Sequence, residues 1–197
     1  MKYPNFFNNI ETIKLKDDLS DFLGAFEDGI VEFTYLDIVK CAGHSCPTVA
    51  GAYLMAREAL KVLFRDSIAK RGEIVVEFKE DIEEGVAGVV ANVISNITGA
   101  TSTDGFKGIG GRFSRCDLMF FNTDITSSVR FSTIDSSKSV DVYYHAARVY
   151  PEEKQSELLQ KIKMGLASKE EIKEFGILWQ KRVENIFLNV DDVIEII

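Results

Sequence analysis

The segment VAGVVANVISNIT, residues 86–98, carries no charged residue, although charged residues make up 27% of the chain. Its apolar side chains recur at helical spacing, and the predicted core face consists of Val86, Val90, Val93, Ile94 and Ile97. The other side carries Asn92, Ser95 and Asn96. A helix without charge on either side is normally covered on both, and Gly99 is typical of a left-handed cap at its end. We therefore expect a layered fold around this helix.

Other segments of the first half also have a clear period. Residues 30–39, IVEFTYLDIV, alternate between apolar and polar positions, which predicts a strand, and EIVVEFK at 73–79 predicts a second. A short helix is expected in DDLSDFLGAF. From Pro47 onward the period is helical, with Arg57 and Lys61 on the predicted solvent side. The predicted buried stripe of that helix consists of Val49, Tyr53, Ala56, Leu60 and Leu63.

The second half predicts strands followed by helices. CDLMFFN, SVRFSTI and SVDVYYHAARV read as strands, and the short polar links between them favour antiparallel hairpins. After Pro151 the period is helical again, and the spacing of Ser168 to Glu171 predicts a capping box at the start of the last helix. The residues that this helix is predicted to bury are Ile172, Phe175, Trp179, Val183 and Ile186.

This order of elements predicts an α+β fold, a mixed or antiparallel sheet packed with helices. The 197 residues, 22.1 kDa, fit a single domain over 1–197, with a core at about 30–150 and a C-terminal helical extension at 151–197. A chain of this length buries roughly two thirds of its unfolded surface. It therefore needs neither a disulfide nor a metal in order to fold.

Charge and cysteine content exclude several classes of function. The formal net charge is −8, from 23 Lys and Arg against 31 Asp and Glu, which disfavours binding to nucleic acid or to an anionic membrane. Three cysteines are too few for a disulfide scaffold, so we expect a cytoplasmic protein. The amino terminus lacks the pattern of an export signal, and no segment has the ~18 apolar residues of a membrane span.

The stretch KCAGHSCPTVAGAYLMA carries the chemistry, because Cys41, His44 and Cys46 lie within six residues of one another. We expect them at the exit of a strand and the entry to a helix, where Gly43 lets the chain fold back. Cys46 stands just before the helix, where free amides and the helix dipole favour a negative charge. A thiolate beside an imidazole can bind a metal or act as a nucleophile.

Two interpretations of this cluster stay open. A zinc-type site needs only one or two further ligands, which His145 or Cys116 could supply, and we prefer it. A catalytic pair of Cys46 and His44 also needs an oriented base and an oxyanion pocket, and neither is recognisable. Packing roles remain open for Cys41, Cys116 and His145. The glycine-rich stretch at 105–111 leads toward a strand, so it reads as a flexible loop or lid rather than a phosphate loop.

Two motifs give the chain a family resemblance. AGHSCPTVAGAYLMA resembles the opening motif of the FmdE family of formylmethanofuran dehydrogenase proteins, a His-Gly-His-x-Cys-Pro-Gly core followed by an apolar helix. ANVISNITGAT is similar to that family's later helix. The resemblance spans roughly residues 38–122. It implies that His44 and Cys46 are metal or active-site positions and that the α+β core forms an intertwined homodimer.

The chain also departs from the family pattern. Ala42 stands where the family has its first histidine and Thr48 where it has glycine. Asn92 replaces a usual aspartate, and Val89 and Ala100 stand where cysteines are frequent. No cysteine follows Cys116, so the resemblance implies a member without the C-terminal zinc finger.

Three functions follow as hypotheses. The first is a cytoplasmic protein of this family type that holds a divalent metal, zinc by preference, through His44 and Cys46 with Cys41 or His145, in or accessory to one-carbon or redox metabolism. The second is a metal-free enzyme with Cys46 as thiol nucleophile and His44 as its base. The third is a dimeric, non-catalytic binding or sensing module that takes a small molecule or a partner enzyme.

Overall fold

The structure, a computed structural model, describes residues 2–65 and 67–197. Its helices are α1 (Asp18–Phe22), α2 (Tyr35–Ala42), α3 (Pro47–Leu63), α4 (Ala87–Thr98), α5 (Glu153–Lys163), α6 (Lys169–Leu188) and α7 (Val190–Val193), with 3-10 turns η1 (Asn5–Asn9), η2 (Glu27–Gly29) and η3 (Ala146–Arg148). Its strands are β1 (Ile13–Lys16), β2 (Ile30–Phe33), β3 (Ala69–Lys70), β4 (Ile74–Phe78), β5 (Met119–Phe120), β6 (Val129–Thr133), β7 (Ser139–Tyr144) and β8 (Ile194–Ile196). The predicted α+β class is confirmed.

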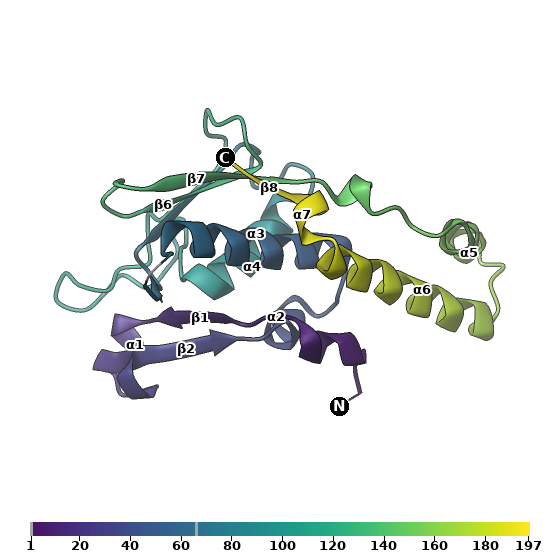
Figure 1. Ribbon diagram of the computed structural model, residues 1–197, viewed down its shortest axis with the longest axis horizontal. Coiled ribbons are helices and arrows are strands. Elements are labelled where there is room, and N and C mark those ends of the chain that lie inside the picture. The colour runs from purple at the N-terminus through teal and green to yellow at the C-terminus, as the bar shows by residue number, and fades with distance from the viewer. Residues whose placement is uncertain (1, 66) are drawn as a thin grey trace.

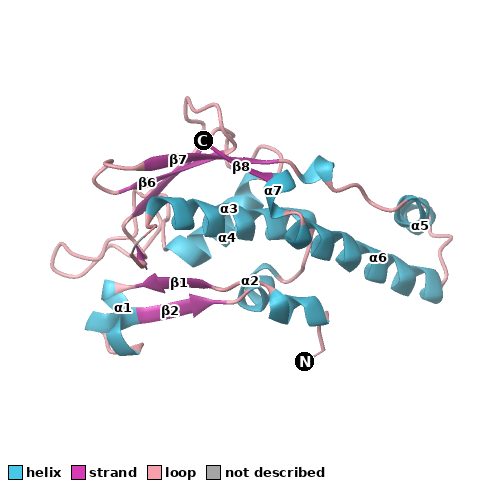
Figure 2. Ribbon diagram, in the orientation of Figure 1, coloured by secondary structure: helices cyan, strands magenta, loops and turns pink. Residues whose placement is uncertain are grey.

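The strands form two sheets with helices between them (Figure 1). The smaller sheet has the order β2-β1-β3, and the larger one has the order β5-β4-β6-β7-β8. In the larger sheet Phe131 of β6 pairs with Val76 of β4 on one side and with Val140 of β7 on the other, both antiparallel. Helices α3 and α4 occupy the layer between the sheets (Figure 2).

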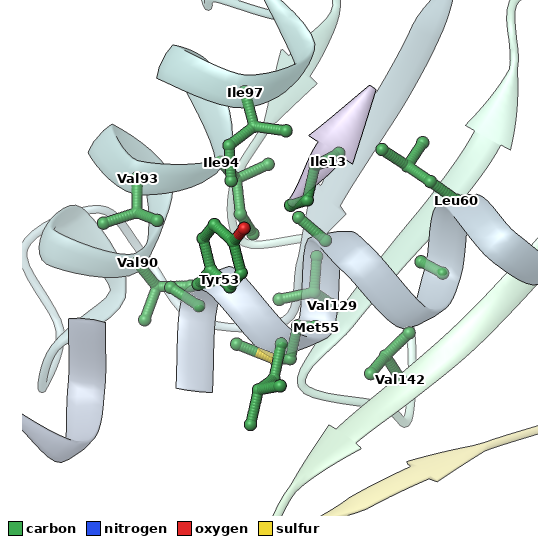
Figure 3. Packing of buried hydrophobic residues seen from close by; sticks show 14 of the residues in the cluster. Ile13, Tyr53, Met55, Leu60, Val90, Val93, Ile94, Ile97, Val129 and Val142 are labelled. Carbon is green, nitrogen blue, oxygen red and sulfur yellow. The ribbon is translucent and has the colours of Figure 1, made fainter. Parts of the chain in front are cut away.

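Helix α3 lies at the centre of the core, and its predicted buried stripe is confirmed. Figure 3 shows Tyr53 of α3 beside Ile94 of α4 and Ile13 of β1. The Tyr53 hydroxyl donates to the carbonyl oxygens of Glu11 (2.8 Å) and Phe33 (3.1 Å), which ties the helix to the smaller sheet. Arg57 does not lie in solvent as predicted. It is buried, because the core surrounds this helix on nearly all sides.

The predicted strand at 30–39 is wrong beyond Phe33. Strand β2 ends there and α2 begins at Tyr35, because Thr34 and Asp37 form a capping box. The Thr34 hydroxyl accepts from the Asp37 amide, and the Asp37 carboxylate accepts from the Thr34 amide, each at 3.1 Å. The turn that follows residue 42 therefore joins two helices rather than a strand and a helix.

The predicted hairpin between the CDLMFFN and SVRFSTI segments is also wrong. Only Met119 and Phe120 of the first segment are extended, as β5, and they pair in parallel with β4 rather than with β6. The hairpin of β6 and β7 is confirmed. Strands β1, β3 and β8 were not predicted.

Two predictions of burial fail on helix surfaces. Val86 was predicted to lie on the core face but is 51% exposed, and Val89 is 38% exposed. Asn92 and Asn96 are exposed as well, so the uncharged outer side of α4 is not covered by the described part of this chain. On α6, Val183 and Ile186 are buried as predicted, but Phe175 and Trp179 are only half-buried, and Ile172 near its start is 51% exposed. The first half of α6 packs with α5 away from the sheets (Figure 1), while its second half joins the core.

None of the helices in residues 2–65 and 67–197 is both long enough and apolar enough to cross a bilayer.

Candidate functional site

The residues of the KCAGHSCP stretch lie at the connection between α2 and α3. Helix α2 ends at Gly43, which takes the left-handed conformation with φ +76°. Helix α3 starts at Pro47 with Cys46 as its N-cap. The last turn of α2 thus carries Cys41, and the short connection carries His44 and Cys46.

Cys41 and His44 face a common groove of about 340 Å³. Both are exposed, and the opposite wall of the groove belongs to α4, with Val89, Asn92 and Asn96 among its residues. The structure therefore brings together a thiol, an imidazole and two side-chain amides beside the uncharged face of α4. Cys46 and His145 do not line this groove.

His44 is oriented by the end of α2. Its Nδ1 atom lies 3.0 Å from the carbonyl oxygen of Ala42. Because a carbonyl oxygen only accepts hydrogen bonds, Nδ1 is the protonated nitrogen in the neutral form of this ring, and Nε2 then has the lone pair. The imidazole therefore presents a free base or metal-ligand nitrogen.

Cys46 has a different environment from Cys41. Its Sγ atom accepts a hydrogen bond from the Val49 amide (3.4 Å), so the sulfur satisfies one of the free amides at the start of α3. The thiol is half-buried and lies near two tyrosines of the core. Burial raises the pKa of Tyr35 and of Tyr144 well above the usual range, and the neighbouring Cys46 adds to both shifts.

Residues from distant parts of the chain hold this connection in place. The Ser45 carbonyl oxygen accepts from Trp179 Nε1 (3.0 Å) and Gln180 Nε2 (3.1 Å) of α6. The Ser45 hydroxyl lies 2.9 Å from the Tyr35 hydroxyl, and the Tyr144 hydroxyl donates to the Pro47 carbonyl oxygen at 2.6 Å. These supporting residues were not predicted, since no local pattern links them to residues 43–47.

The other two candidate ligands have partners of their own. His145 follows β7, and its Nε2 atom lies 2.9 Å from a carboxylate oxygen of Glu195. Cys116 Sγ donates to the Gly105 carbonyl oxygen at 3.1 Å, within the loop that contains the glycine-rich stretch. Among the residues described, no three His, Cys, Asp or Glu side chains gather at a distance that would hold a metal ion.

Comparison with protein-family models gives no match, and comparison with curated proteins gives no significant match either.

Proposed function

We propose that this chain is a cytoplasmic metal-binding protein that holds a divalent, zinc-type ion at the α2–α3 connection. The orientation of His44 carries the proposal. Metal-binding histidines usually donate their second ring N–H to a carbonyl or carboxylate, which fixes the ring. The 3.0 Å contact from Nδ1 to the Ala42 carbonyl oxygen is of this kind and leaves Nε2 for an ion.

Cys41 and His44 together provide two of the ligands that a zinc site needs. Cys41 shares the groove with His44, and a thiol with an imidazole nitrogen is a normal zinc pair. One chain supplies two donors there, so the remaining positions would fall to water, to a second copy of the chain, or to Cys46 if its sulfur left the Val49 amide. An ion with an open position would activate water or polarise a substrate carbonyl, whereas a closed site would be structural or sensing.

We also infer membership of the FmdE family of formylmethanofuran dehydrogenase proteins, with a role in or accessory to one-carbon or redox metabolism. The motif AGHSCPTVAGAYLMA supports this inference, and so does the α+β class of the fold. We propose that the chain forms a homodimer with a second copy of itself. The dimer would in turn bind a small molecule or a partner enzyme.

A metal-free thiol enzyme is the second candidate, and the N-cap position of Cys46 favours it. The Val49 amide and the dipole of a 17-residue helix stabilise a negative sulfur. His44 is two residues away with a free Nε2 atom. In this mechanism His44 would accept the Cys46 thiol proton while the sulfur attacks an acyl carbon or a disulfide sulfur. The bond to the leaving alcohol, amine or thiol would break, and that group would depart with the proton from His44.

Metal analysis of protein purified without added ions tests the first candidate. We expect one ion per site in the wild type and loss of most of it in His44→Ala and Cys41→Ser. His145→Ala is the matched control, because its imidazole pairs with Glu195 outside the groove, and it should keep the ion. Equal metal content in all four proteins would remove the assignment. A metal-free wild type in which iodoacetamide modifies Cys46 faster than Cys41, and more slowly after His44→Ala, would favour the thiol enzyme.

A further inference from the structure

A second site is suggested by a buried carboxylate that faces two guanidinium groups. Asp17 is 4% exposed, and its two oxygens lie 2.8 Å from Arg71 Nη1 and 2.6 Å from Arg115 Nη2. Burial alone would raise the pKa of Asp17, but hydrogen bonds from Arg71 and the Ser20 amide and the two positive charges lower it overall. The single negative charge of Asp17 is therefore shared by the positive charges of Arg71 and Arg115.

The two arginines differ in how their donors are used. Arg71 also donates through Nε to the Ile97 carbonyl oxygen (3.0 Å) and through Nη2 to that of Asn96 (3.1 Å), so it caps the end of α4. Arg115 is only 6% exposed, yet within the described chain its Nε and Nη1 atoms donate no hydrogen bond. Arg115 thus has spare donors in a buried setting.

Arg115, which has these unused donors, lines a cavity of about 480 Å³. The cavity lies between α1, the turn before β4 and the loop at 111–115. Gly72 forms part of its wall at φ +82°, and a side chain there would overlap the guanidinium of Arg115. A glycine at this position keeps the space that the Arg115 side chain occupies.

A tight turn places a third arginine on the same cavity. Gly110 and Gly111 have φ +57° and +76°, and Ile109 and Arg112 exchange backbone hydrogen bonds of 2.9 and 3.1 Å across them. This is the geometry of a two-residue hairpin turn. Arg112 lines the cavity, is exposed, and lies over the Phe113 ring at 4.5 Å from its centre. Phe113 has φ +66°, which is an unfavourable backbone conformation for a bulky residue. Strained conformations of this kind cluster at functional sites.

The charges around the cavity do not balance. Its two acidic residues, Asp18 and Glu73, share Lys70 at 4.0 and 3.5 Å. In the parts of the chain that the structure describes, Arg112 has no carboxylate within salt-bridge distance, and Arg115 shares Asp17 with Arg71. Lys70, Arg71, Arg112 and Arg115 together outnumber Asp17, Asp18 and Glu73 by one charge, so the surroundings of the cavity carry one net positive charge in a protein whose net charge is −8.

We propose that this cavity binds a phosphate monoester of a small molecule, with Arg115 and Arg112 holding the phosphate group. Guanidinium groups bind phosphate through paired, charge-assisted hydrogen bonds. A phosphate monoester carries close to two negative charges at neutral pH, which matches the two arginines. The volume exceeds that of a bare phosphate and falls in the range of small-molecule sites, and Phe113 offers an apolar surface for the rest of the ligand. The cavity shares no lining residue with the groove at His44.

Calorimetric titration with phenyl phosphate, benzoate and phenol, at neutral pH and constant ionic strength, tests the proposal. The wild type should bind phenyl phosphate saturably at one site, bind benzoate more weakly and not bind phenol. Arg112→Ala should weaken phenyl phosphate binding about tenfold or more, the effect of one charge-assisted hydrogen bond. Arg115→Gln should abolish it, with circular dichroism used to verify that the variant is folded.

Lys107→Ala is the matched control, because Lys107 carries the same charge, is exposed in the same loop and does not line the cavity. Its affinity should equal that of the wild type. Absence of saturable binding to the wild type would overturn the proposal. An equal loss in Arg112→Ala and Lys107→Ala would do so as well, and benzoate binding as tight as that of phenyl phosphate would overturn the phosphate assignment. Metal content should not change in Arg112→Ala, so this result is independent of the His44 site.

Discussion

At the scale of single residues, Gly51 shows how close the packing around the candidate site is. It lies in the first half of α3, and a Cβ atom there would overlap the ring of Tyr144. Tyr144 needs this close approach because its hydroxyl donates to the Pro47 carbonyl oxygen. Because Gly51 has no side chain, Tyr144 of β7 can approach α3 and form its hydrogen bond to Pro47 at the start of that helix.

Gly51→Ala should therefore destabilise the protein by about 1–3 kcal/mol, the usual cost of an inserted methyl group in a tight core. Urea unfolding followed by circular dichroism measures it. Gly176→Ala in α6 is the control, because nothing lies within 4 Å of a Cβ atom there, and it should stabilise by about 0.5–1 kcal/mol. A Gly51→Ala protein as stable as the wild type would show that Tyr144 can move aside.

The sequence predicted the chemical residues of the site better than their support. The types and spacing of Cys41, His44 and Cys46 were enough to single out this connection. The shared groove of Cys41 and His44 depends on α4, and the anchors of Ser45 come from residues more than 130 positions later. Such contacts follow from the tertiary fold and leave no local pattern.

At the scale of elements, the boundary between β2 and α2 decides where the candidate ligands lie. The alternating pattern of residues 30–35 favoured a strand, but the capping box of Thr34 and Asp37 starts a helix there. The same type of signal at Ser168 and Glu171 was recognised and is confirmed. At Thr34 the period-two pattern hides the capping box, because the alternation of apolar and polar residues continues to Tyr35, two residues past the end of β2.

Thr34→Ala should cost about 1 kcal/mol of stability, the usual contribution of an N-cap hydroxyl. Thr34→Ser keeps the hydroxyl and should restore nearly all of it. Guanidinium unfolding of the three proteins measures the difference. Equal losses in the alanine and serine variants would mean that the methyl group of Thr34, rather than its hydrogen bond to the Asp37 amide, stabilises α2.

Long periodic elements were predictable, whereas short strands were not. The helices from Pro47 and from residue 87 show their period over three or more turns, and both are present. Strand β3 has two residues and β8 has three, too few to show alternation, and only two residues of the predicted CDLMFFN strand form β5. They exist because β1, β4 and β7 offer them backbone partners.

At the scale of the whole molecule, the uncharged side of α4 has no cover within the described chain. Ile82, Val86 and Val89 are each between 38% and 51% exposed, and no charged residue lies on the helix. Exposed apolar side chains that lie this close in sequence and carry no neighbouring charge are consistent with an interaction site. It borders the groove of Cys41 and His44, so a second copy of the chain seated there would also close that groove.

We expect the wild type to sediment as a dimer and Val89→Asp to sediment as a monomer. Because Val89 makes part of an exposed face, the variant should lose no more than about 0.5 kcal/mol of monomer stability. Ile177→Asp is the control, since Ile177 is 62% exposed on α6 and away from this face, and it should remain dimeric. A monomeric wild type would contradict the proposed dimer, and a dimeric Val89→Asp would place the partner surface elsewhere.

The attachment of Ser45 to α6 has a consequence for biosynthesis. Cys41, His44 and Cys46 leave the ribosome early, but the Trp179 and Gln180 side chains that fix their connection are translated more than 130 codons later. Until then the nascent chain carries two thiols in an unsupported segment. Elements made first fold first where they can, yet the Ser45 carbonyl oxygen gains its two side-chain donors only when α6 has docked. Any ion that requires the contacts of Ser45 with Trp179 and Gln180 therefore binds only after α6 has been made and has docked.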